Sequence, residues 1–250
     1  MTTTDDVRPA PAMTPTPPAA PKAGAGHRGV TLLFALTGFL GACLLFLVEP
    51  LVAKLLLPSF GGSATVWSTS SLFFQILLLV AYGYCHVSTR LLARWQPKAH
   101  LLVLLAPVLV LPLALPADAA PPTDGWPALW LLRTLAVMIG LPFVVVATTG
   151  PLLQKWYSWT LGPGADDPYF LFAASNLGSF VGLLAYPFVV ESRLSLVDQR
   201  GWWSAAYGGF VVLTACCAVH AGRQSSTREA PDASARSVVH STLGRARVVR

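Results

Sequence analysis

Apolar residues in this chain gather into six long runs, separated by shorter polar stretches. The runs cover residues 30–48 (continuing toward residue 57), 69–92, 99–115, 127–147, 169–190 and 202–221. A mostly apolar run of about 18 or more residues matches the hydrocarbon thickness of a bilayer and is typical of a spanning helix. The pattern therefore predicts an all-α fold, a polytopic membrane bundle of about six transmembrane helices.

Composition supports this interpretation, because the chain has too few polar side chains to cover a water-facing surface. It is 54% hydrophobic and 11% charged, whereas an ordinary soluble domain carries about 25% charged residues. The runs are continuous rather than alternately apolar and polar, which favours helices over a barrel. The third run is the shortest and contains Pro107 and Pro112, which interrupt helical hydrogen bonding.

The two ends of the chain differ from its centre. Residues 1–28 are rich in Pro, Ala and Thr, and residues 222–250 are polar and rich in Arg. Neither segment has apolar periodicity, so we expect disordered tails on either side of a six-helix transmembrane domain at 29–221. The first run begins only near residue 30 and has no Ala-x-Ala site followed by a polar break. We therefore predict a retained first span rather than a cleaved signal peptide.

Basic residues indicate how the bundle is oriented. If the N-terminus is inside, the two tails and the inner loops hold most of the 17 lysines and arginines, and the outer loops hold only Arg193 and Arg200. Cytoplasmic loops usually carry this excess, so the sequence predicts a multi-pass protein with both termini cytoplasmic. The net charge of +6 then follows from topology. We expect a lipid bilayer and no nucleic acid as partner, because no soluble domain carries a basic face.

No enzyme signature is present in the sequence. The chain has no Gly-rich phosphate loop, nucleophile elbow or His/Glu metal helix, so it predicts no catalytic residue and no cofactor. Four cysteines, Cys43, Cys85, Cys216 and Cys217, all fall within apolar runs and lack metal-ligand spacing. They are interpreted as small apolar packing residues, and no metal site is expected.

Charged and strongly polar residues inside the spans are the candidate site. Glu49, Lys54 and Arg133 fall in or beside apolar runs, and Asn176 lies within the fifth. Such groups are costly in hydrocarbon and usually face the protein interior, so the four residues are predicted to converge on a solute-binding cavity. Pro50 would interrupt the first helix beside them, as in transporters with broken helices. In the alternative interpretation, Lys54 extends to the interface and Glu49 pairs with Lys54 or Arg133 to stabilise the bundle.

Small residues in the fifth run predict a close helix contact. Ala174, Gly178 and Gly182 recur every four residues, which places them on one face of a helix. Such a face permits close approach between the backbones of two helices. Asn176, from the same run, could hydrogen-bond across that contact.

Four strings, in order along the chain, resemble the membrane portion of bacterial spermidine-synthase-like proteins, the fused major-facilitator/spermidine synthase proteins. They are 46–54 (FLVEPLVAK), 58–67 (PSFGGSATVW), 149–156 (TGPLLQKW) and 167–179 (DPYFLFAASNLGS). The resemblance covers about residues 30 to 220 and implies a bacterial inner-membrane protein. Many members continue into a cytoplasmic aminopropyltransferase-like domain, and this chain has no sequence for one. The resemblance therefore implies a membrane context and no enzymatic activity.

Two functions follow as hypotheses. The first is a transporter-like solute-binding module, a major-facilitator-like half that needs a homodimer or a second membrane chain. Polyamines or related metabolites are implied as substrates by the resemblance alone, and a site containing Lys54 and Arg133 would suit a polycation poorly. The alternative is a non-transporting scaffold or anchor for a separately encoded cytoplasmic synthase-like enzyme, or a truncated fragment of a longer protein.

Overall fold

The computed structural model describes residues 25–115, 126–160, 165 and 167–247, and this part of the chain is helical with no strand. Five helical segments are long and apolar enough to cross a membrane, namely Gly26–Phe60, Ala64–Val110, Pro127–Tyr157, Tyr169–Arg193 and Leu196–Gln224. The predicted all-α, multi-span character is confirmed.

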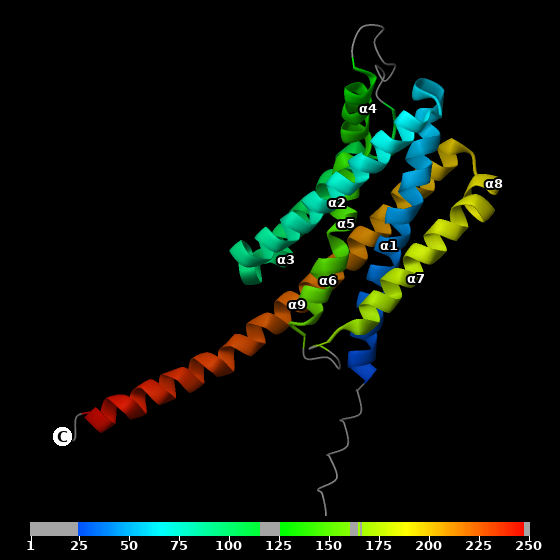
Figure 1. Ribbon diagram of the computed structural model, residues 1–250. Coiled ribbons are helices and arrows are strands. Elements are labelled where there is room, and N and C mark those ends of the chain that lie inside the picture. The colour runs from blue at the N-terminus through cyan, green and yellow to red at the C-terminus, as the bar shows by residue number, and fades with distance from the viewer. Residues whose placement is uncertain (1–24, 116–125, 161–164, 166, 248–250) are drawn as a thin grey trace, which may run out of the picture.

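Short 3-10 and π turns (η1 to η4) divide some of these segments. In chain order the elements are α1 (Ala25–Phe60), α2 (Ala64–Leu92), η1 (Ala93–Trp95), α3 (Gln96–Leu105), η2 (Ala106–Val110), α4 (Pro127–Leu135), η3 (Ala136–Gly140), α5 (Leu141–Ala147), α6 (Thr149–Tyr157), α7 (Tyr169–Ala185), η4 (Tyr186–Val190), α8 (Glu191–Arg193) and α9 (Leu196–Arg247). Figure 1 shows α1 running beside α7 and α2 crossing α5, with which it is in contact.

The contact between α1 and α7 is the most extensive in the bundle. Gly178 and Gly182 of α7 lie against the backbone of α1 at Phe39 and Cys43. A Cβ atom on Gly182 would lie 3.0 Å from the Cys43 carbonyl oxygen, and one on Gly178 would overlap the Phe39 carbonyl. The Cys43 thiol also donates to the Gly178 carbonyl oxygen, at 3.1 Å. Because glycine has no side chain, Gly178 and Gly182 allow the two helices to approach this closely. Ala174, the third residue of the predicted small-residue face, is half-buried.

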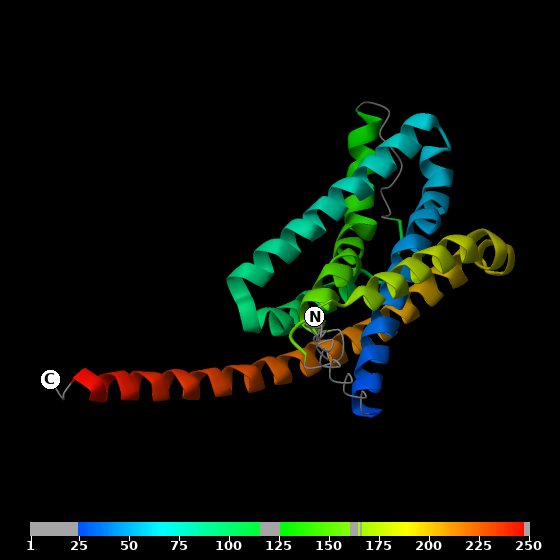
Figure 2. The same cartoon turned by 60° about the horizontal axis from the view of Figure 1, so that its bottom comes forward.

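Helices α1 and α9 both contribute to two hydrophobic clusters. The first cluster includes Leu44, Phe74, Phe143, Tyr186 and Tyr207. The second lies at the other end of the bundle and includes Phe34, Trp156, Tyr157, Leu171, Cys217 and Ala221. Because Phe34 of α1 and Ala221 of α9 share the second cluster, the start of α1 and the end of the apolar part of α9 lie at the same end (Figure 2). These two ends lie on one side of the bundle, in agreement with the predicted topology. That this side is cytoplasmic stays a prediction.

The third predicted run differs most from expectation. The chain turns sharply after α2 at Ala93, whose φ is +42°, and returns through the short α3 and η2. Helix α3 has 10 residues and η2 has 5. Together they span about 25 Å, which is less than the roughly 30 Å thickness of the hydrocarbon core of a bilayer. The second and third runs therefore share one long helical segment, and the count of six spans stays a prediction.

Pro50 and Pro58 lie inside a continuous α1, so the prediction that Pro50 interrupts the first helix is wrong, since each proline removes one helical hydrogen bond without ending the helix. Other prolines lie where helices change their geometry. Pro142 follows the π-turn η3, and Pro187 lies within the π-turn η4. Pro151 lies one turn after Ala147, beside the break between α5 and α6. A proline nitrogen has no hydrogen to donate to the carbonyl four residues earlier, so the hydrogen-bond register shifts at each of these three positions.

The C-terminal segment also differs from its expectation. Helix α9 continues past Gln224, where its apolar part ends, to Arg247, and its last portion projects away from the bundle (Figure 1). Most of the segment 222–250, which we expected to be disordered, is therefore helical. The predicted N-terminal tail falls mainly on residues 1–24, outside the described residues.

The glycine contact predicts a specific loss of stability. A Gly178→Ala substitution should lower the free energy of unfolding by about 1–3 kcal/mol, because the new methyl group would force α7 away from the α1 backbone. Thermal unfolding of the detergent-solubilised protein measures this. Gly83→Ala in α2 is the control, since nothing lies within 4 Å of its added Cβ atom. Equal melting temperatures for the two variants would contradict the packing account.

Candidate functional site

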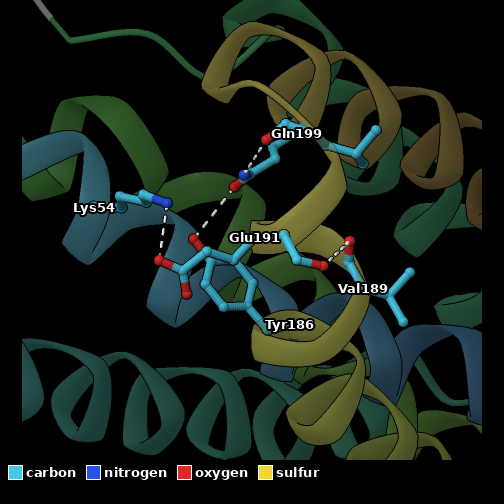
Figure 3. Close-up of polar contacts among 7 residues, drawn as sticks. Lys54, Tyr186, Val189, Glu191 and Gln199 are labelled. Carbon is cyan, nitrogen blue, oxygen red and sulfur yellow. Dashed lines mark hydrogen bonds and ion pairs between the residues drawn. The ribbon is translucent and has the colours of Figure 1, made fainter.

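The four residues predicted to form the site do not form one cluster. Lys54 Nζ lies 2.9 Å from Glu191 Oε1 of α8, as Figure 3 shows. Glu49 precedes Lys54 by five residues, about 140° around the helix, so the two side chains leave α1 in different directions. Glu49 has no hydrogen-bond or ion-pair partner among the described residues, so its expected pairing with Lys54 or Arg133 is absent there.

Lys54 belongs to a group that fastens the end of α1 to the turn between α7 and α9. Next to its ion pair, the Tyr186 hydroxyl donates to Gln199 Oε1 at 3.2 Å, and Gln199 Nε2 donates to the Leu194 carbonyl at 2.9 Å (Figure 3). Gln199 is 3% exposed, so its hydrogen bonds satisfy a buried amide. The geometry gives Lys54 a structural role.

Arg133 and Asn176 lie elsewhere on the surface of the bundle. The Arg133 guanidinium lies 4.9 Å from the centre of the Trp130 ring on the same helix, α4. Asn176 is exposed on α7. Neither residue lines the cavity described next.

A cavity of about 200 Å³ lies between α1, α2, α5, α6 and α7. Its wall combines hydroxyl groups with glycines, which leave room beside the helices; the residues concerned are Tyr82, Thr149, Ser175, Ser179, Gly38 and Gly41. No charged residue lines it. A polar cavity within a membrane bundle is a candidate binding site.

Four of the lining residues carry hydroxyl groups, and the rest of the wall is apolar or glycine. The buried Thr149 Oγ1 has no hydrogen-bond partner among the described residues. Pro50 and Pro151 have no amide hydrogen to offer the carbonyls of Phe46 and Ala147, four residues earlier, and both of these residues line the cavity. A ligand that donates hydrogen bonds would therefore find acceptors on two sides.

Glu49 extends one face of the cavity. Ala42 and Phe46 line it, and Glu49 lies seven residues after Ala42, which returns it to almost the same side of α1. Its side chain is exposed. A carboxylate without a partner, one turn beyond an acceptor-rich cavity, makes this region attractive to cations.

Helix α2 presents three distinct faces. Its buried face packs on the core through Phe73, Phe74, Ala81 and Cys85. One exposed face is apolar, with Leu72, Ile76, Leu79, Val80 and Val87. The other exposed face is polar over most of the helix, with Ser68, Ser71, Gln75, Tyr82 and His86. Tyr82 lines the cavity, so the polar face lies on the cavity side, and the apolar face is the one suited to lipid.

A buried polar group behind the cavity was missed by the sequence analysis. Trp156 Nε1 donates to Gln96 Oε1 at 2.6 Å, and His100 lies 3.1 Å from the Tyr84 hydroxyl and 3.5 Å from Thr148 Oγ1. Gln96 and His100 are fully buried. They fasten α3 to the break between α5 and α6, beside Thr149. Their spacing of four residues, which puts both on one helical face, was the available signal.

Comparison with known proteins adds no further constraint. No protein-family model, curated protein or solved structure matches the chain. The resemblance to spermidine-synthase-like proteins therefore stays an expectation, and function is argued from the geometry of the site.

A double-mutant cycle on Lys54→Met and Glu191→Gln tests the structural role of Lys54. The side chains are 32% and 47% exposed, so the coupling energy should be small, about 0.2–1 kcal/mol. Chemical unfolding of the solubilised single and double variants measures it. A coupling near zero would mean that the ion pair does not stabilise the end of α1.

Proposed function

We propose that this chain is a transporter-like, solute-binding membrane module whose binding site is the cavity at the break between α5 and α6. The observation that carries the proposal is the pairing of an acceptor-rich cavity with an unpartnered carboxylate. Thr149 Oγ1 is buried without a partner, and Glu49 lies one turn beyond the lining residues of α1. The unpartnered hydroxyl of Thr149 supports a ligand in the cavity, because buried polar groups usually have partners, and the exposed Glu49 offers that ligand a charge.

The substrate class that fits this site is an organic amine cation. An ammonium group donates hydrogen bonds and carries a positive charge, which suits carbonyl, hydroxyl and carboxylate oxygens. Lys54 does not counter Glu49, because its charge is neutralised by Glu191 at 2.9 Å. Lys54 therefore repels a polyamine less than an unpaired lysine would. Polyamines or related metabolites remain within the proposed class.

The exposed polar face of α2 supports a module that is completed by another chain. Polar side chains in spanning helices rarely face hydrocarbon, yet Gln75 and His86 are exposed. A second copy of this chain, or a second membrane chain, would enclose this face and the cavity beside it. Such an assembly would correspond to the two halves of a major-facilitator-like transporter.

Glu49→Gln should weaken amine binding by about tenfold or more, because a hydrogen bond to a charged group contributes about 1.5–3 kcal/mol. Thermal-shift titration of the purified full chain with spermidine, a neutral amino acid and a dicarboxylate measures this. The double variant Lys54→Met/Glu191→Gln is the matched control, since it removes a carboxylate outside the cavity together with the lysine that this carboxylate neutralises. We expect amine stabilisation in wild type and in this double variant, and little in Glu49→Gln.

The alternative function is a non-transporting scaffold or anchor. It draws support from α9, which continues as a helix beyond its apolar part to Arg247 and would offer a contact for a cytoplasmic synthase-like partner. Folded wild-type protein that is stabilised by none of the three ligand classes would contradict the binding module and favour the scaffold.

A further inference from the structure

A second cavity, of about 460 Å³, lies where the turn between α2 and α3 meets α9. Three basic side chains line it, Arg94, Lys98 and Arg223, and its lining contains no acidic residue. Arg94 of η1 and Lys98 in the first turn of α3 are far in sequence from Arg223 on α9, and the packing of α3 on α9 brings them together. The cavity does not share a lining residue with the one proposed to bind solute.

The remainder of the cavity wall is apolar. Pro97 and Leu101 come from α3, and Val219 from α9. Arg223 precedes by one residue the end of the apolar segment of α9, so the basic side chains lie at a boundary between apolar and polar chain. Lys98 Nζ lies 4.5 Å from the centre of the exposed Trp95 ring. Tryptophan with a neighbouring basic residue is typical of the headgroup level of a membrane.

We propose that this cavity binds the headgroup of an anionic phospholipid. Three basic side chains around one cavity attract a phosphate group. Arginine and lysine bind phosphate through charge-assisted hydrogen bonds. The apolar wall fits the glycerol backbone and the first carbons of the acyl chains. Basic pockets between membrane helices have this chemistry, and a free phosphate ion would leave the apolar wall unused.

The test titrates full-length protein in neutral detergent with phosphatidylglycerol, phosphatidylcholine and inorganic phosphate, and follows thermal unfolding. Phosphatidylglycerol should raise the melting temperature, whereas phosphatidylcholine and inorganic phosphate should not. The double variant Lys98→Gln/Arg223→Gln should bind phosphatidylglycerol about thirtyfold more weakly, at about 1 kcal/mol for each charge removed. Lys155→Gln is the control, because Lys155 lies near Trp159 on α6 at the same end of the bundle and outside the cavity.

Two outcomes would overturn the proposal. An equal response to phosphatidylglycerol in the double variant and in wild type would mean that the lipid acts elsewhere on the protein. A response to inorganic phosphate as large as that to phosphatidylglycerol would assign the site to a free anion. Should the double variant not fold, the single variants Arg94→Gln and Lys98→Gln provide the same comparison, each with a smaller expected loss.

Discussion

Backbone hydrogen bonding is the constraint on which the rest of this structure depends. In hydrocarbon a peptide group must find its partner within the protein, so an apolar chain of this kind folds into helices. Proline withholds one donor and can change a helix, although α1 continues as one α-helix through Pro50 and Pro58. Pro142 and Pro187 accompany π-turns, and Pro151 accompanies the break between α5 and α6. The cavity lies at that break, so its acceptors follow from the same rule that makes the rest of the bundle regular.

Some charged residues of the bundle stabilise its fold, and others lie beside the two cavities. Lys54 and Glu191 neutralise each other and hold α1 to the turn before α9. Glu49, on another side of α1, has no ion-pair partner among the described residues. The basic residues of the second cavity lie at the end of the bundle that holds Phe34 and Ala221. Two regions of opposite charge therefore suit two different ligands, a cation and a phosphate.

The sequence could predict what depends on local pattern. Long apolar runs predicted the helices, and the spacing of Gly178 and Gly182 indicated the face that meets α1. The third run was ambiguous because Pro107 and Pro112 shorten its helix, and the turn at Ala93 has no sequence signal that we recognised. The polar face of α2 was available in the spacing of Ser68, Gln75 and Tyr82, seven residues apart, and this spacing was missed.

Long-range pairing could not be predicted in this way. Lys54 and Glu191 are 137 residues apart, and no periodicity indicates which acid a lysine will meet. Gln96 and His100 lie near the start of a short helix, where polarity usually means exposure, yet both are fully buried because Trp156 and Thr148 provide their partners. The cavity itself requires five elements to be placed relative to one another, which a single sequence does not specify.

Cysteine accessibility in native membranes tests most directly whether the polar face of α2 lies on the side of the cavity and not against lipid. Gln75→Cys and Val80→Cys would be compared in a chain whose four native cysteines are replaced, using a water-soluble maleimide. The account predicts rapid labelling at position 75, on the cavity side, and little labelling at position 80, on the apolar face. Equal protection at both positions, or faster labelling at position 80, would contradict it.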